Sequence, residues 1–228
     1  MATEQTDTLA NPRVLRLIRP SVVVLCGPAA CGKSTFAAKH FRPTQIISSD
    51  QARALVCDDE RDQRFQTQAF ALVHFLVEQR LSINRLCVVD STALTAAARK
   101  SLLDLARRFH VPAVALVLDV PLEICLQRDT QRERTVGRPV IEHQHQLFEQ
   151  AKPSIRQEGF DQVVELSAQD MDNVQTEIVF RPVPRPAPPN AHLERRQSAS
   201  RPPRPTAAGK DDQPETRAAS ASERGPAN

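Results

Sequence analysis

"SVVVLCGPAACGKSTFAAKH", residues 21–40, decides the fold, because it places a glycine-rich turn between an apolar run and a helical stretch. Residues 21–26 are almost entirely apolar and end at the first glycine, which predicts a short central strand. A helix is predicted from Lys33 to about His40. Between these elements, residues 27–34 fit the pattern G-x-x-x-x-G-K-[ST]. The pattern stands after a strand and before a helix, which is the setting that a phosphate-binding loop requires.

The chemistry of this loop predicts its ligand. Glycines let main-chain N–H groups turn inward around phosphate oxygens, and the helix N-terminus adds partial positive charge. Lys33 would reach the outer phosphates, and the Ser34 hydroxyl would ligate Mg²⁺. An ordinary glycine-rich turn is the alternative, but the flanking strand and helix argue against it. Because the guanine-reading pattern N-K-x-D is absent, we expect ATP or a loose choice of nucleotide rather than strict GTP. The expected cofactors are ATP and the Mg²⁺ that Ser34 would ligate. The residues expected to bind the nucleotide are Gly27, Pro28, Ala29, Ala30, Cys31, Gly32, Lys33, Ser34 and Thr35.

The rest of the chain up to about residue 166 alternates between strand and helix patterns. Further strands are predicted at residues 45–48, 86–90, 111–119 and 161–166. Helices are predicted at about residues 62–80, 94–110, 122–134 and 140–157, and the last two are separated by the breaker Gly137-Arg138-Pro139. Such alternation predicts an α/β fold, a parallel sheet with helices on both faces.

The chain divides by composition into residues 1–13, a domain at 14–180, and a tail at 181–228. The tail holds nine of the Lys and Arg residues, five of the Asp and Glu residues, and ten of the eighteen prolines. Val183 and Leu193 are its only residues of the types Leu, Ile, Val and Phe. We therefore predict that residues 1–13 are flexible and that the tail is disordered. The tail is either a solvated extension or a basic arm with weak, salt-sensitive attraction to nucleic acid.

Cysteine spacing and hydropathy bear on the compartment. The five cysteines form no paired spacing such as C-x-x-C, which fits reduced thiols in a cytosolic protein. No apolar run reaches the ~18 residues that a membrane span needs. The start of the chain has no basic region followed by an apolar one. We expect a cytoplasmic protein without membrane contact.

The stretch "SSDQAR", residues 48–53, follows the second predicted strand and places a carboxylate three residues before a guanidinium. If a helix begins at about Asp50, then Asp50 and Arg53 share one of its faces. Asp50 could simply cap that helix and pair with Arg53, an interaction worth a few tenths of a kcal/mol. However, ligands of open α/β sheets lie beyond the carboxyl ends of the strands, where this stretch should meet the phosphate-binding loop. There the carboxylate could deprotonate an acceptor hydroxyl, and the arginine could bind an anionic group of the acceptor.

With these residues the sequence resembles the kinase domain of bacterial polynucleotide kinase-phosphatases, the P-loop 5′-hydroxyl polynucleotide kinases. The resemblance covers about residues 14–167 and rests on "GPAACGKSTFAAKHF", "SSDQARALVCDDERDQ", "VVDST" and "RERTVGRPVIEHQHQ". It implies a P-loop kinase-like three-layer fold, an about five-stranded parallel sheet and an arginine-rich lid that folds over ATP. It also implies transfer of the ATP γ-phosphate to a 5′-OH end of RNA or DNA, which makes nucleic acid the expected substrate. Partner proteins are not indicated.

The resemblance also implies roles for individual residues. Lys33 would contribute to catalysis, and Asp50 would be the general base. Arg53 and Gln63 would bind the phosphate on the 3′ side of the acceptor nucleotide. Arg128 and Arg134 fall nearest to the two lid arginines, with Arg132 or Arg138 as candidates to replace the second. A solvated charged face is the alternative explanation of this arginine-rich stretch.

Some residues depart from the family pattern or leave the function open. Asp90 ends a predicted strand and would hold a metal-bound water or Lys33, or merely cap the strand end together with Ser91 and Thr92. Many family members read Asp-Ala-Thr-Asn here, whereas this chain has Ala93 in place of the Asn. Two other hypotheses remain: a kinase acting on a small-molecule hydroxyl, and a nucleotide-dependent binding switch that uses the tail as its interaction arm.

Overall fold

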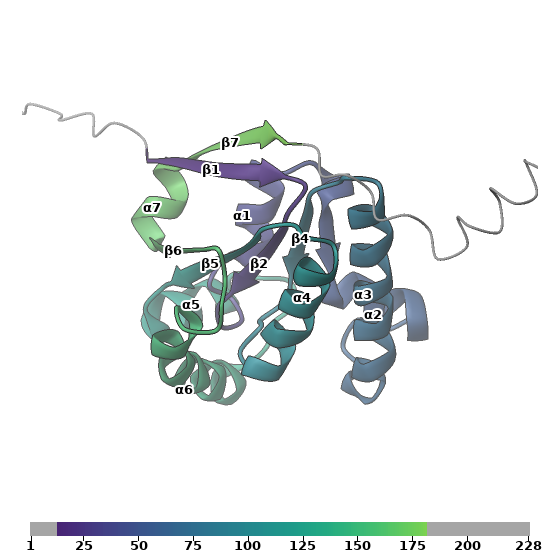
Figure 1. Cartoon of the computed structure of the whole chain (residues 1–228). Helices are drawn as coiled ribbons and strands as arrows, with labels where there is room; N and C mark the ends of the chain where they lie inside the picture. The colour runs from purple at the N-terminus through teal and green to yellow at the C-terminus, as the bar shows by residue number, and fades with distance from the viewer. Residues whose placement is uncertain (1–12, 182–228) are drawn as a thin grey trace, which may run out of the picture. The chain divides into compact units, whose positions relative to one another are not determined.

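The computed structural model describes residues 13–181, and the predictions for residues 1–12 and 182–228 lie outside this range. A five-stranded parallel sheet is at its centre (Figure 1). Its strands, in spatial order, are β3 (Ile46–Ser48), β4 (Cys87–Asp90), β2 (Val22–Cys26), β5 (Ala113–Asp119) and β6 (Gln162–Ser167). The predicted α/β fold with a five-stranded parallel sheet is confirmed.

Helices cover both faces of this sheet (Figure 1). They are α1 (Lys33–His40), α2 (Ser49–Cys57), α3 (Gln66–Ser82), α4 (Ala96–Arg108), α5 (Leu122–Thr130), α6 (Arg138–Ile155) and α7 (Ala168–Asn173). Short 3-10 turns occupy η1 (Pro43–Gln45) and η2 (Gln63–Phe65). The central strand β2 is fully buried, with Val22 and Val24 in one apolar core and Val23 and Leu25 in the other. Because side chains alternate along a strand, β2 supplies both cores and fixes the loop that follows it.

A second, two-stranded parallel sheet pairs β1 (Val14–Arg19) with β7 (Gln175–Phe180). Neither strand was predicted, although Leu15 and Leu17 alternate with polar residues and are buried. Because the pairing joins residues as distant in the sequence as Val14 and Gln175, no local sequence pattern predicts it.

Several predicted helices begin or end at other residues in the structure. The helix predicted to reach Arg134 ends at Thr130, so that arginine lies in an irregular segment instead. The next helix begins after Gly137, whose φ of 94° lies in the region that favours glycine. The short helix α7 was not predicted. Within residues 13–181, no helix is long and apolar enough to cross a bilayer.

Candidate functional site

The loop between β2 and α1 has the backbone that its glycines predict. Gly32 has φ 104° and precedes the first residue of α1, and Ala30 has φ 59°. A Cβ on Gly27 would come within 2.8 Å of the Cys31 Sγ and 3.2 Å of the Leu118 carbonyl oxygen. Both glycines are therefore required, one for its dihedral angles and one for close approach.

Lys33 lies inside the curve of this loop. Its side chain is buried, and its Nζ donates hydrogen bonds to the carbonyl oxygens of Gly27 at 3.0 Å and Pro28 at 2.6 Å. The Ala29 N–H donates to the Oε1 of Gln144 on α6 at 2.8 Å. Gln144 was not predicted, because nothing in the sequence around it connects α6 with the loop.

The loop borders a cavity of about 780 Å³ at the carboxyl end of the sheet. We call this the main cavity; it is lined by the loop, the start of α2, the end of β4, the segment between α5 and α6, and parts of α3 and α6. The predicted site residues that line it are Ala29, Ala30, Gly32, Lys33, Ser34, Asp50, Arg53, Gln63 and Arg134. Thus the phosphate-binding loop and the stretch at residues 48–53 meet in one space, as the topology of an open parallel sheet requires.

Asp50 stands in the first turn of α2 but does not cap it. Ser48 is the N-cap, and its Oγ accepts a hydrogen bond from the Gln51 N–H at 3.3 Å. The interpretation of Asp50 as the helix cap is therefore wrong, although its predicted ion pair with Arg53 is present at 2.9 Å. The second carboxylate oxygen of Asp50 lies 3.6 Å from Nη1 of Arg134.

Arg53 is held more firmly than a surface ion pair would be. Its side chain is 2% exposed, whereas that of Asp50 is 50% exposed. Besides Asp50, the guanidinium donates to the Glu60 carbonyl oxygen at 2.6 Å and to Oε1 of Gln66. Gln63, the predicted partner of Arg53, lines the same cavity. A buried guanidinium fixed from three sides presents a stationary positive charge to the cavity.

Asp90 ends β4 beside the loop and is 8% exposed. Burial raises the pKa of its carboxyl, and nearby Asp50 raises it further, whereas the hydrogen bond from Ser34 and the charges of Lys33 and Arg132 lower it. From its sequence, Asp90 has either a functional role or that of a strand-end cap. Asp90 lines the main cavity together with Ser34 and Lys33.

These two oxygen donors fit a hard divalent cation such as Mg²⁺. Within residues 13–181 there is no cluster of three or more His, Cys, Asp or Glu side chains that could hold a metal ion. Ser34 and Asp90 would therefore share Mg²⁺ with phosphate oxygens, as is common for this ion.

We predict that Asp90→Asn stabilises the nucleotide-free protein while weakening binding of Mg²⁺-ATP. The substitution removes a desolvated carboxylate crowded by Asp50, so the free energy of unfolding should rise by about 1 kcal/mol. Loss of the charge should cost roughly tenfold in Mg²⁺-dependent nucleotide affinity. Thermal unfolding and titration with a fluorescent ATP analogue measure the two effects. The exposed Asp58→Asn is the control, and a lower unfolding midpoint together with unchanged affinity would contradict the prediction.

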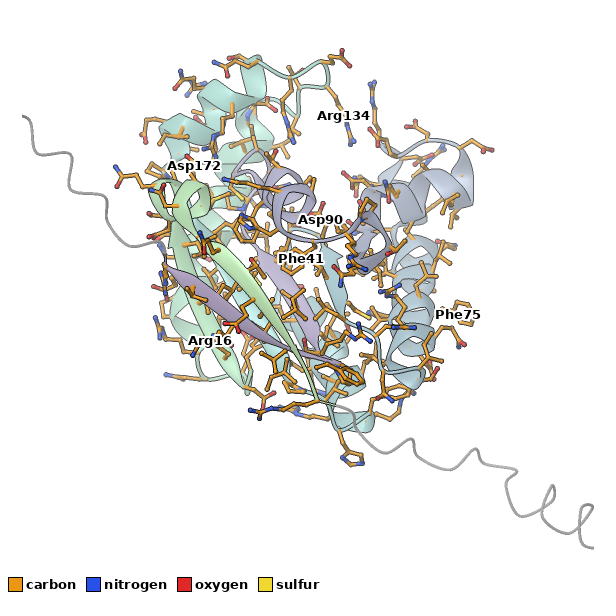
Figure 2. All side chains as sticks on the ribbon, turned by 90° about the horizontal axis from the view of Figure 1, so that it is seen from above. Arg16, Phe41, Phe75, Asp90, Arg134 and Asp172 are labelled. Atoms are coloured by element: carbon orange, nitrogen blue, oxygen red, sulfur yellow. The ribbon has the colours of Figure 1, made fainter. Side chains whose placement is uncertain are left out.

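The arginines of the arginine-rich stretch do not all line the same cavity. Arg128 donates to the Cys31 carbonyl oxygen at 2.8 Å and lines a second cavity of about 360 Å³ beside α1 and α7. Arg132 lines both cavities. Arg134, which Figure 2 labels, pairs with Glu60 and Asp50. Arg138 pairs with Glu142 on its own helix and does not line the main cavity. Arg128 and Arg138 thus lie apart from Asp50, whereas Arg132 and Arg134 share its cavity.

A family model of AAA domains matches residues 22–151, a span that contains every residue lining the main cavity. The chain belongs to this family. No curated protein sequence matches the chain. The match accounts for the phosphate-binding loop and makes the chain a P-loop nucleotide-binding domain.

Solved structures of similar fold come from several kinds of protein. The Streptococcus pneumoniae PezAT toxin–antitoxin structure aligns with a TM-score of 0.52 and 16% identity, covering 73% of this chain and 72% of that one. Kti12 from Chaetomium thermophilum in complex with ADP-AlF3 aligns with a TM-score of 0.50 and 15% identity, covering 66% and 93%. A chain of the Pnkp1/Rnl/Hen1 RNA repair complex aligns with a TM-score of 0.49 and 20% identity, covering 60% of this chain. This chain spans 47% of that repair protein's length. At such identities, the first two alignments show the shared P-loop kinase-like fold alone.

Proposed function

We propose that the chain is an ATP-dependent phosphotransferase that transfers the γ-phosphate to a 5′-hydroxyl end of RNA or DNA. The observation that carries the proposal is one cavity lined by the phosphate-binding loop, by Asp50 and by the buried guanidinium of Arg53. A phosphate donor and a hydroxyl acceptor have to meet in such a space. The sequence motifs at residues 48–63, which resemble those of 5′-hydroxyl polynucleotide kinases, favour this acceptor over others.

In the proposed reaction, the residues of the cavity transfer a proton or neutralise charge on the phosphates. Asp50 accepts the proton of the acceptor hydroxyl as that oxygen attacks the γ-phosphorus and the bond to the leaving ADP breaks. Lys33 and the arginines of the α5–α6 segment neutralise charge on the transferring phosphoryl group. Mg²⁺, held by Ser34 and Asp90, would supply further charge neutralisation on the phosphates.

The acceptor side would recognise an anion next to the reacting hydroxyl. Arg53 and Gln63 would bind the phosphate on the 3′ side of the acceptor nucleotide, since a guanidinium and an amide both donate hydrogen bonds to phosphate oxygens. Phe70 and Val140 also line the cavity and give it an apolar side. A nucleotide end, with a base and a phosphate, suits such mixed walls.

A second candidate is transfer to a hydroxyl of a small molecule. The segment joining α2 to η2 carries Asp59, Glu60 and Asp62, with Arg61 between them, and Glu60 pairs with Arg134, which lines the cavity. Acidic groups at this place repel a polyanionic strand that would run past them. This observation favours either a short nucleic-acid end or a compact anionic metabolite.

One assay distinguishes the two candidate functions. With labelled ATP and Mg²⁺, we expect label to move to an oligonucleotide with a 5′-OH end and not to its 5′-phosphorylated twin. RNA and DNA versions, together with a panel of hydroxylated small molecules, define the acceptor. Label on a small molecule but on neither oligonucleotide would overturn the proposed acceptor and retain the phosphotransferase. No labelled product with any acceptor, despite bound ATP, would overturn both.

A further inference from the structure

We propose that Asp129 is a positioning residue that holds the lid segment, residues 131–137, over the main cavity. The proposal rests on the proposed function in that Arg132 and Arg134 of this segment serve phosphate transfer. Asp129 is the penultimate residue of α5 and is 4% exposed. Its Oδ1 accepts a hydrogen bond from the Val136 N–H at 2.9 Å, and its Oδ2 accepts one from the Gly137 N–H at 3.0 Å.

A carboxylate at this depth has to be stabilised by the groups around it. Within residues 13–181, no salt bridge joins Asp129 to a cation. Two main-chain N–H groups stabilise its carboxylate by hydrogen bonds. One of them belongs to Gly137, the N-cap of the 18-residue helix α6. Hydrogen bonds to a charged acceptor are stronger than neutral ones, and a helix N-terminus favours an anion. Asp129 therefore fastens the end of α5 to the start of α6.

Few other hydrogen bonds fix the main chain of the lid segment. Gln131 and Arg132 donate main-chain hydrogen bonds back to the last turn of α5, at 3.3 Å each. Among the hydrogen bonds of the described residues, the main-chain N–H groups of residues 133–135 have no partner in the main chain. The two bonds of Asp129 close the far end of the segment, and between the two ends Arg132 and Arg134 reach the main cavity. Moving that end would move both guanidiniums relative to Asp50.

Proteolysis distinguishes a lid anchor from general support of the fold. Asp129→Asn preserves the shape of the side chain, but its NH₂ group faces one of the two N–H donors and cannot accept from it. We expect trypsin to cut after Arg132 and Arg134 about tenfold faster than in the unaltered protein, because cleavage follows local opening. Arg138 precedes a proline and resists trypsin, so the peptides that end in the lid segment are assigned cleanly by mass spectrometry. The matched control is Asp104→Asn, an exposed acid on α4.

The result that supports the proposal is faster cleavage confined to the lid segment, with the rest of the domain protected. Cleavage spread over the whole domain would overturn it, because Asp129 would then support the fold in general. An unchanged rate at Arg132 and Arg134 would overturn it as well. None of these outcomes requires phosphate transfer, so they stand apart from a failure of the proposed function.

The effect of Asp129 on catalysis is measured with whichever acceptor receives the labelled phosphate from ATP. With Asp129→Asn, kcat should fall about tenfold while KM for ATP changes less than threefold, because displaced guanidiniums stabilise the transition state less than the bound nucleotide. A rise in KM with kcat unchanged would overturn this assignment and place Asp129 in nucleotide binding alone. Asp104→Asn should leave both constants unaltered.

Discussion

Replacing Asp50 by Asn should lower the rate of phosphate transfer about a thousandfold and leave ATP affinity within a factor of two. The amide retains the shape of the carboxylate but cannot accept the proton of an attacking hydroxyl, and a positioned base contributes about 10²–10⁴-fold. Binding should persist because the nucleotide would be held by the loop at residues 27–34 and by Lys33. Single-turnover transfer from labelled ATP, together with equilibrium binding of an ATP analogue, measures the two quantities.

The control is Asp58→Asn at the other end of the same helix. Asp58 is the C-cap of α2 with φ 59°, a conformation that asparagine also adopts, so this change should leave transfer unaltered. The structure offers Asp50 a local role as well, in its ion pair with the buried guanidinium of Arg53, which is also held by the Glu60 carbonyl oxygen and by Gln66. Survival of transfer in Asp50→Asn would therefore leave that local role as the only one. A loss of ATP binding equal to the loss of transfer would also contradict the assignment of Asp50 as base.

The part of the fold that the sequence predicts is the part with local signals. The strand before Gly27 and the helix after Gly32 are dictated by a buried apolar run and by a loop whose dihedral angles demand glycine. The same holds for the meeting of Lys33 and Asp50, because the carboxyl ends of parallel strands share one edge. Their shared edge follows from the parallel direction of the strands that precede them.

What the sequence could not predict depends on contacts between distant residues. The β1–β7 pair brings together segments separated by most of the chain, and β7 shows no clean alternation of buried residues. The sequence alone does not distinguish Asp90 from an ordinary strand end, because its place beside Ser34 in the cavity depends on β4 lying next to β2. Arg132 and Arg134 lie in the irregular segment after α5, which ends earlier than its pattern suggested, whereas Arg128 and Arg138 lie in helices. Where a helix stops decides which side chains of a charged stretch face the cavity.

A buried ion pair between Arg99 and Glu158 supports the loop that follows β4. Arg99 on α4 is 1% exposed, and its guanidinium binds both carboxylate oxygens of Glu158, at 2.7 and 2.6 Å. Its remaining nitrogen donates to the Ala93 carbonyl oxygen at 2.7 Å, next to Thr92, whose carbonyl accepts from the Gly27 N–H. Arg99 thus fixes the β4–α4 loop against the start of the phosphate-binding loop.

We predict that Glu158→Ala lowers the free energy of unfolding by about 3–5 kcal/mol, because it leaves the Arg99 guanidinium buried without its counter-charge. Adding Arg99→Met should recover part of this loss, since the pair then disappears as a unit. Denaturant unfolding measures both variants. The control is Asp104→Ala, which breaks exposed pairs with Lys100 and Arg107 on the same helix and should leave the unfolding midpoint unchanged. Equal stability of Glu158→Ala and Asp104→Ala would contradict the prediction.

The pH dependence of stability tests the same pair with a definite sign. Hydrogen bonds from Arg99 lower the pKa of Glu158 below its ordinary 4.5, against the opposing effect of burial. A carboxyl with a lowered pKa in the folded state contributes stability above its unfolded pKa and loses that contribution as pH falls through the folded pKa. The unaltered protein should therefore lose stability more steeply than Glu158→Gln on acidification below about pH 4.5. Parallel pH profiles for the two proteins would mean that Arg99 draws its stabilisation from the Ala93 carbonyl and its apolar surroundings alone.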